Sequence, residues 1–594
     1  MVRRFDKQEP ALLISGRASL ETSIKKQVTR IKNKRRNQSL LQLGMVLGIA
    51  LFLNILGNAF FTHYDLTEEK RFTLSEPTQN LLHRLDDVVY IEVLLEGEFP
   101  AGFKRLQRSV KEMLDDFRSE SGFIEYTFTD PNRGSVKDIN QRREELAKDG
   151  IVPTNLRVKY VEGTTEKMIY PYAKVNYHGR TAVVDLLDEQ ARGTNPEEQL
   201  NNSISQLEYN FANALHKLEI GVKEVIAFTA GHGELSELER KDLVRSLRAY
   251  YEVGTFNLDS ATYIPQDIKV LIVAKPRTTF SNRDKFLIDQ YVMNGGKVMW
   301  LIDRLNVELD SLRRANAYVP PDYPLDLDDI LFKYGARINP DLILDLRCTH
   351  IPMVIDAKGT QELFPWYYHP IAFPNAEHAV VKSLDGVNLF FPSSIDTIKT
   401  KTPVKKTILL ASSDKSRIQP NITRLNFEIL RYDPDPSKFT KEHIPMAVLL
   451  EGTFPSLFEN RVTESMAEGL QQLGQEFKSA SVPTRMLLVS DGDIARNLIS
   501  NAKGQVMPLG FNRFERYQFA NKDFLLNAIE YLRDDQGIIE ARGKEIKLRL
   551  LNTTKAEAEQ TKWQLVNVGL PLVFLMIVAL VFNWIRNNRF AKGE

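Results

Sequence analysis

Residues 267–303 read DIKVLIVAKPRTTFSNRDKFLIDQYVMNGGKVMWLID, in which a helical pattern separates two apolar runs. The runs Val270–Ala274 and Val298–Ile302 are continuously apolar, which is typical of strands covered on both faces. The intervening residues 280–296 predict an amphipathic helix. Strand–helix–strand units with short turns indicate a parallel, doubly wound sheet.

The same alternation continues on both sides of this segment. KEVIAFTAGHGE (223–234) predicts a strand that runs into a glycine-rich turn, and LVRSLRAYYEV (243–253) predicts a helix. Farther along, RMLLVSDGD (485–493) predicts a buried strand, and NKDFLLNAIEYL (521–532) predicts another amphipathic helix. We therefore expect an α/β domain over residues 221–540.

The sequence predicts two further features outside this alternating strand–helix pattern. Residues 325–460 are less regular and rich in proline and aromatic residues, so they predict an insertion or a β-rich extension of the larger domain. Residues 63–220 predict a smaller α/β domain, because a strand at 88–97, a helix at 101–121 and a strand at 122–131 form a β-α-β start.

The chain carries an apolar segment near each end. Residues 39–62 and 565–586 each contain about 20 mostly apolar residues, the length that a helix needs to cross a bilayer. We expect two transmembrane helices. A cleaved signal peptide is the alternative for the first, and a buried core helix that contains Pro571 is the alternative for the second.

Positive charges flank both apolar segments and set the expected orientation. Flanking lysine and arginine stay cytoplasmic, so we expect residues 1–38 and 587–594 inside, and the bulk of the chain in the periplasm of an inner membrane. Residues 541–564 predict a stalk. The charges are Lys25, Lys26, Arg30, Lys32, Lys34, Arg35, Arg36, Arg586, Arg589 and Lys592.

Composition excludes several classes of function. The chain has 78 basic and 77 acidic residues, so its net charge gives no argument for nucleic-acid binding. The one cysteine, Cys348, excludes a disulfide framework and a thiolate metal cluster, and it lies in no nucleophile motif. Gly295-Gly296-Lys297 lacks the spacing of a phosphate-binding loop, so we expect no ATPase activity by that route.

Two strand ends carry candidate site residues. His232 and Glu234 follow one predicted strand, where open α/β sheets bind ligands, and they could do acid–base work or hold a metal. A histidine in a glycine-rich turn also commonly caps the helix that follows. Asp491 and Asp493 follow another strand and could bind a cation, although an Asx-Gly turn is the simpler interpretation.

A short repeat supplies two further candidates. LLEGEFPAGF (94–103) recurs as LLEGTFPSLF (449–458), and Phe99 and Phe454 occupy the same place in each copy. The simpler interpretation is a similar turn at the end of a strand. The other is a pair of loops that present a matched aromatic surface to a partner or ligand.

The chain resembles the GldG family of gliding-motility ABC transporter auxiliary components of Bacteroidetes. The resemblance rests on YDLTEEKRFTLSE (64–76), LLEGEFPAGFKRL (94–106), GHGE (231–234), SDGDIARN (490–497) and NKDFLLNAIEYL (521–532). It implies a GldF-like permease, a GldA-like cytoplasmic ATPase, and a link to gliding and type IX secretion. It also implies that the larger domain has a class I glutamine amidotransferase-like fold, without the nucleophilic cysteine of the active members.

These observations leave three functions open. We expect a non-catalytic, membrane-anchored subunit that recognises a ligand or transmits ATP-driven motion from the permease. A membrane-tethered periplasmic enzyme that uses His232, Glu234, Asp491 or Asp493 is the second class, and a passive cell-envelope scaffold is the third. We expect no cofactor and no metal.

Overall fold

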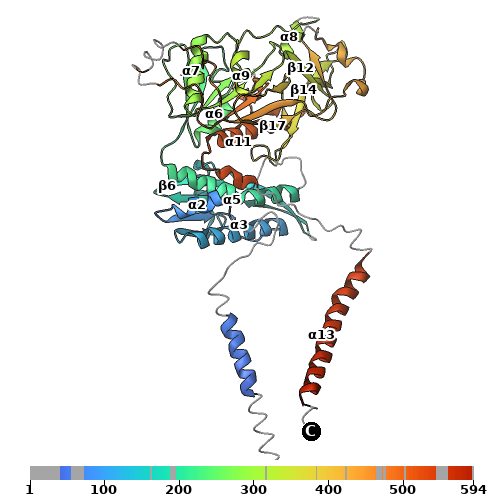
Figure 1. Ribbon diagram of the computed structural model, residues 1–594. Coiled ribbons are helices and arrows are strands. Elements are labelled where there is room, and N and C mark those ends of the chain that lie inside the picture. Colours follow the sequence, from blue (N-terminus) through green and yellow to red (C-terminus); the bar gives the residue numbers. More distant parts are fainter. Residues whose placement is uncertain are drawn as a thin grey trace, which may run out of the picture. The chain divides into compact units, whose positions relative to one another are not determined.

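The computed structural model is a mixed α/β structure (Figure 1). It describes residues 40–54, 73–160, 163–187, 196–314, 317–382, 384–421, 424–462, 471, 476–500, 504–543 and 559–590. The chain divides into two compact units, residues 1–73 and 74–594, which are described separately.

One described helix is long and apolar enough to cross a membrane. This helix, α13 (Gln560–Phe590), contains a spanning segment at Gln560–Ile585, which the rest of the described chain does not cover. That exposure argues against the buried core helix. The described part of the first apolar segment is a helix over Leu40–Asn54, too short to span alone, and residues 55–62 lie outside the described residues, so the first span stays a prediction.

A four-stranded sheet in the order β2-β1-β5-β6 organises the first part of the second unit. β1 and β2 are parallel and are joined by α3, which buries Leu106, Val110 and Leu114 at helical spacing. β5 pairs antiparallel with β1 and with β6. The elements are α2 (Glu76–His83), β1 (Val89–Val93), α3 (Ala101–Glu120), β2 (Ile124–Phe128), α4 (Val136–Lys148), β3 (Thr154–Tyr160), β4 (Gly163–Ile169), β5 (Tyr172–Tyr177), β6 (Arg180–Asp185) and α5 (Pro196–Ile220).

A large sheet of ten strands forms the next part, in the order β13-β14-β17-β19-β20-β10-β9-β7-β8, with β15 beside β14. Its parallel half contains β7 (Val225–Ala230), β8 (Glu252–Asn257), β9 (Ile268–Ala274), β10 (Lys297–Leu301) and β20 (Thr484–Val489). Its antiparallel half contains β13 (Cys348–Val354), β14 (Gln361–Pro374), β15 (Val387–Asn388), β17 (Val404–Ala411) and β19 (Pro445–Gly452).

The prediction of a doubly wound parallel sheet therefore describes only half of this sheet. Residues 325–460 supply four antiparallel strands and the short strand β15, and β19 joins them to the parallel half through β20. Proline occurs along the 14-residue β14, at Pro365, Pro370 and Pro374. Proline lacks a backbone donor and weakens the sequence signal for a strand, which explains why the region looks irregular in sequence.

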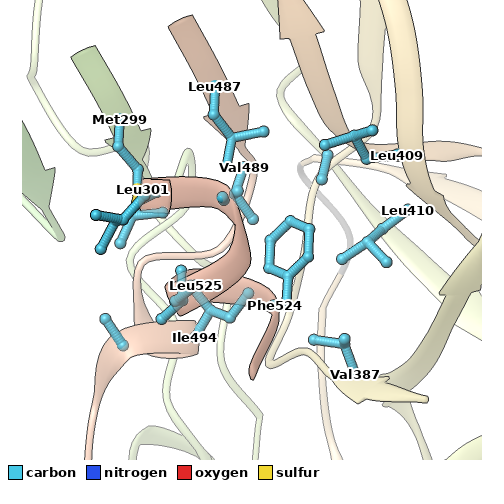
Figure 2. Packing of buried hydrophobic residues seen from close by; sticks show 14 of the residues in the cluster. Met299, Leu301, Val387, Leu409, Leu410, Leu487, Val489, Ile494, Phe524 and Leu525 are labelled. Carbon is cyan, nitrogen blue, oxygen red and sulfur yellow. The ribbon is translucent and has the colours of Figure 1, made fainter. Parts of the chain in front are cut away.

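Helices cover the large sheet and close its core. They are α6 (Lys241–Arg248), α7 (Asn282–Met293), α8 (Leu309–Arg314), α9 (Asp328–Tyr334) and α11 (Asn521–Arg533). Figure 2 shows Phe524 and Leu525 of α11 among the apolar side chains of both halves, including Val489 of β20 and Leu410 of β17. This helix therefore packs the parallel and antiparallel strands into one hydrophobic core.

Short elements complete the second unit. They are β11 (Ala336–Ile338), β12 (Asp341–Asp345), β16 (Ile395–Thr397), β18 (Ser416–Pro420), β21 (Ile499–Ser500), β22 (Gln505–Val506), β23 (Phe511–Asn512), β24 (Tyr517–Gln518) and the 3-10 helices η1 (Phe427–Leu430), η2 (Pro436–Lys438), η3 (Asp493–Ala495) and η4 (Ile538–Gly543). Of the predicted stalk, residues 544–558 lie outside the described residues.

Candidate functional site

The carboxyl ends of the parallel strands bring polar residues to one edge of the large sheet. His232 follows β7, Lys275 follows β9, Asp303 follows β10, and Asp491 follows β20. These strands are neighbours in the order β7-β9-β10-β20. Open α/β sheets bind ligands outside this edge, so these residues form the candidate site.

A buried lysine joins the ends of three strands. Lys275 is 0% exposed, and its Nζ lies 2.9 Å from Asp303 Oδ2 and 2.5 Å from Asp493 Oδ2. Its backbone φ of 55° is uncommon for a residue other than glycine. Gly492 permits this approach, because a Cβ there would lie 2.7 Å from Lys275 Cβ. The ammonium therefore acts as the internal cation of this cluster.

The ionisable side chains of the cluster shift one another's pKa values. Burial lowers the pKa of Lys275, but the carboxylates of Asp303 and Asp493 outweigh it and raise the pKa overall. Burial raises the pKa of Asp493, but the cations of Lys275 and Arg496 outweigh it and lower the pKa overall. The pKa of Asp303 is raised, because burial raises it more than the positive charge of Lys275 lowers it. Asp493 is therefore the carboxylate that stays ionised beside the ammonium.

Asp491 has a different role from Asp493. Its Oδ2 accepts a hydrogen bond from the backbone N–H of Phe390 at 2.8 Å, and its Oδ1 accepts one from the N–H of Asp493 at 2.8 Å. Burial, followed by the negative charges of Asp303 and Asp493, raises the pKa of Asp491 well above its usual range. Ligand atoms of the three aspartates lie within 4.8 Å of one another, but Lys275 already supplies their cation. The geometry favours the turn interpretation of Asp491.

His232 and Glu234 form a separate buried pair. Both side chains are 3% exposed, and the His232 ring stacks on Phe280 with 3.8 Å between ring centroids. His232 Nε2 lies 3.3 Å from Asp284 Oδ2, the carboxylate that caps the start of α7. Glu234 Oε2 accepts a hydrogen bond from the His232 N–H at 2.8 Å. His232 therefore contacts the cap of α7 rather than the helix that follows it in sequence.

The pair keeps two polar atoms without hydrogen bonds. His232 Nδ1 and Glu234 Oε1 lie 3.9 Å apart, and neither has a hydrogen-bond partner among the described residues. No hydrogen bond or ion pair within the described chain joins this pair to Asp491 or Asp493. The candidates from the two strand ends thus lie at one edge of the sheet in two separate groups.

The repeated turns bury their aromatic rings. Phe99 is 8% exposed in the core of the small sheet, whereas Phe454 is 0% exposed in a core of the large sheet. Gly97 and Gly452 have φ of 132° and 143°, so both turns need glycine. The rings belong to different cores and form no matched exposed surface, which corrects that interpretation and favours the shared turn.

A cavity of about 440 Å³ opens beside the Lys275 cluster. Asp493 and Arg496 reach it from the parallel half, while His369 of β14 and Phe391 reach it from the antiparallel half. Arg496 lies within SDGDIARN, so the motif could have indicated it. His369 and Phe391 carry no sequence signal, because only the antiparallel strands bring them to this edge.

Cys348 lies within β13, away from any strand–helix elbow. Burial, followed by the charges of Asp345 and Glu515, raises the pKa of its thiol to about 12. A thiol rather than a thiolate is present at neutral pH, and the thiolate is the nucleophile. This environment agrees with the absence of a nucleophile motif around Cys348.

Comparisons with known proteins identify relatives over most of the chain. Residues 223–528 match a family model described as an ABC-type uncharacterized transport system, and residues 68–176 match a domain of unknown function. An uncharacterized protein of Borreliella burgdorferi is 22% identical over 574 residues, covering 95% of this chain and 100% of the relative. A solved structure titled mmIFT52 N-terminal domain is 10% identical and covers 52% of this chain and 96% of its own. Its TM-score of 0.29 is too low to indicate a shared fold.

Proposed function

The chain belongs to the family described as the ABC-type uncharacterized transport system, and from this membership we propose that it is a non-catalytic auxiliary subunit of an ABC transporter. The family match over residues 223–528 carries the proposal, because it covers the large sheet and the cavity at its edge. The spanning-length helix α13 adds a means of attachment to a membrane. The basic residues that follow its apolar part favour a cytoplasmic C-terminus and an extracytoplasmic main domain.

The partners of such a subunit are a multi-span permease and a cytoplasmic ATPase. The chain has no phosphate-binding loop of its own, so the energy for any transport must come from another subunit. We propose GldF-like and GldA-like proteins for these roles, and an inner-membrane complex that serves gliding motility or type IX secretion. This narrower assignment rests on the sequence resemblance.

A membrane-tethered enzyme is the second candidate function. The observation that favours it is the buried pair His232 Nδ1 and Glu234 Oε1, which lie 3.9 Å apart without hydrogen-bond partners in the described chain. Such a pair could move a proton. Against it, both side chains are 3% exposed and neither lines the 440 Å³ cavity, so a substrate has no described route to them.

Co-purification tests the proposal. The tagged full-length chain is extracted from its native membranes in mild detergent, and the proteins that accompany it are identified by mass spectrometry. We expect a stoichiometric multi-span permease and an ATPase, and we expect His232→Asn and Glu234→Gln to leave that complex intact. Recovery of the chain alone, as a stable monodisperse protein, would contradict the subunit assignment.

A second experiment tests how the subunit couples to its partners. If anchoring at both ends transmits permease movement, replacing α13 with an unrelated apolar span should abolish transport or gliding while the chain remains in the membrane. Unchanged function in that variant would show that the helix serves only as an anchor.

A further inference from the structure

Three buried polar residues of the lining of the 440 Å³ cavity have a side-chain nitrogen without a hydrogen-bond partner among the described residues. His369, Asn497 and Asn388 are 6%, 3% and 4% exposed. His369 Nε2 and Asn497 Nδ2 have no hydrogen bond within the described chain. The Asn388 amide oxygen accepts from Thr349, while its nitrogen donates to no described residue. The nitrogens of His369 and Asn497 are themselves out of reach of water, so the Asn388 amide nitrogen is the donor of this wall that is left to an occupant.

Aromatic rings form the apolar part of the same wall. Phe390, Phe391, Phe511 and Phe514 line the cavity. Phe391 has a φ of 51°, a conformation that a bulky residue rarely adopts, and a hydrogen bond of 2.8 Å from its N–H to the Tyr368 carbonyl holds it there. Strained residues of this kind cluster at ligand-binding sites. The rings offer a surface for an aromatic or branched apolar group.

One arginine of the lining has no carboxylate partner among the described residues. The three carboxylates that line the cavity each lie within ion-pair distance of a cation, in the pairs Glu308 with Arg496, Asp310 with Arg313, and Asp493 with Lys275. Arg513 is exposed, and its guanidinium lies 4.7 Å from the centroid of the Phe514 ring. It makes no ion pair with a described residue. Arg513 is therefore the cation of this wall that is left to pair with an anionic ligand.

We propose that this cavity binds a small amphipathic carboxylate with an aromatic or branched apolar group, of the kind found in an N-acylated amino acid or at the C-terminus of a peptide. The rings would contact the apolar group, Arg513 would contact the carboxylate, and Asn388 would donate to the acyl carbonyl. A volume of 440 Å³ lies within the usual range for small-ligand sites. The inference names a ligand for the subunit proposed above, but its test uses the isolated chain and can fail while the transporter assignment stands.

Calorimetric titration with matched probes tests the proposal on the full-length chain in detergent. The probes are N-acetyl-L-tryptophan and N-acetyl-L-tryptophanamide, which differ only in the carboxylate. We expect saturable binding of one acid per chain and roughly fivefold weaker binding of the amide, because a solvent-exposed charge contact contributes little. A short peptide that ends in tryptophan distinguishes the sources: tighter binding than the acid indicates a peptide terminus, and weaker binding indicates a free acylated amino acid.

Two variants locate the binding in the cavity. Arg513→Gln should remove the preference for the acid and leave the affinity for the amide unchanged, whereas the matched surface variant Arg337→Gln should change neither. Asn388→Leu should weaken both probes several-fold. No saturable binding of the acid by the wild-type chain, equal binding of both probes, or the same result for Arg513→Gln and Arg337→Gln would overturn the proposal.

Discussion

Replacing Lys275 with methionine tests whether the ammonium holds the strand ends together. The substitution keeps a side chain of similar length and removes the charge that contacts Asp303 at 2.9 Å and Asp493 at 2.5 Å. The side chains of these two partners are only 10% and 12% exposed, so water replaces the ammonium poorly. Removing one partner of a buried ion pair costs about 3–5 kcal/mol of unfolding free energy.

Lys285→Met is the matched control. Lys285 has a side chain that is 2% exposed, but its partners Asp326 and Asp329 are 64% and 35% exposed. These carboxylates can be hydrated when the ammonium is removed, so we expect a loss of about 1 kcal/mol or less. The two variants differ mainly in the burial of the carboxylates that they leave unpaired.

Thermal unfolding followed by tryptophan fluorescence measures the difference. Trp300 and Trp366 are both 0% exposed and report on the large-sheet region. At about 2 °C per kcal/mol, Lys275→Met should lower the midpoint by roughly 6–10 °C and Lys285→Met by about 2 °C or less. Equal shifts for the two variants, or a shift of Lys275→Met below that of the control, would refute the role assigned to the buried ammonium.

The pH dependence of this difference has a definite sign. In the wild type, the charges of Lys275 and Arg496 outweigh burial and lower the pKa of Asp493. This carboxylate therefore stabilises the fold at pH values above its unfolded pKa of about 3.9, and the stabilisation is lost as pH falls. Without Lys275, protonation of the buried carboxylates relieves the unpaired charge. The deficit of Lys275→Met should therefore be largest at neutral pH and shrink as the pH falls toward 4.

Three further predictions concern other parts of the structure. Burial, followed by the charges of Asp345 and Glu515, raises the pKa of the Cys348 thiol to about 12. Iodoacetamide at pH 8 should therefore label the native chain far more slowly than the urea-unfolded chain. Equal labelling rates would contradict the buried thiol. Gly452→Ala should cost about 1–3 kcal/mol of unfolding free energy, because a Cβ at Gly452 would lie 2.4 Å from the Pro403 carbonyl oxygen. Gly359 faces open space, so Gly452→Ala should lower the thermal unfolding midpoint more than Gly359→Ala. Burial lowers the pKa of His369 to about 3, below its unfolded value of about 6.5, so the unfolded state binds more protons between these values and the fold loses stability as pH falls. His369→Gln should reduce the loss of midpoint between pH 7 and pH 5, and an unchanged loss would argue against a buried neutral imidazole.

The parallel half of the large sheet was predictable because its signals are local. Apolar runs predicted β9 and β10, and glycine-rich turns predicted the strand ends that carry His232 and Asp491. Helix α7 begins at Asn282 with a capping box formed by Ser281 and Asp284, which is also a local signal. Each of these features depends on residues close together in the chain.

The antiparallel half and the cavity depend on contacts between distant residues. Proline interrupts the pattern of β14 at three positions. The pairing of β19 with β20 has no counterpart in local sequence. His369, Phe391 and Asn388 become neighbours of Asp493 only through that pairing, so sequence reasoning found the acidic residues and missed the cavity beside them.

The adjacency of β10 and β20 has a consequence for the biogenesis of the protein. Val298 of β10 pairs with Met486 of β20, so a ribosome that adds 5–20 residues per second needs roughly 10–40 s to deliver the second strand after the first. During that interval the apolar edge of β10 has no partner, and Lys275 has only one of its two closest carboxylates. We expect the emerging chain to depend on a chaperone at this stage, and truncations that end before residue 484 to be degraded rather than to accumulate as partly functional fragments.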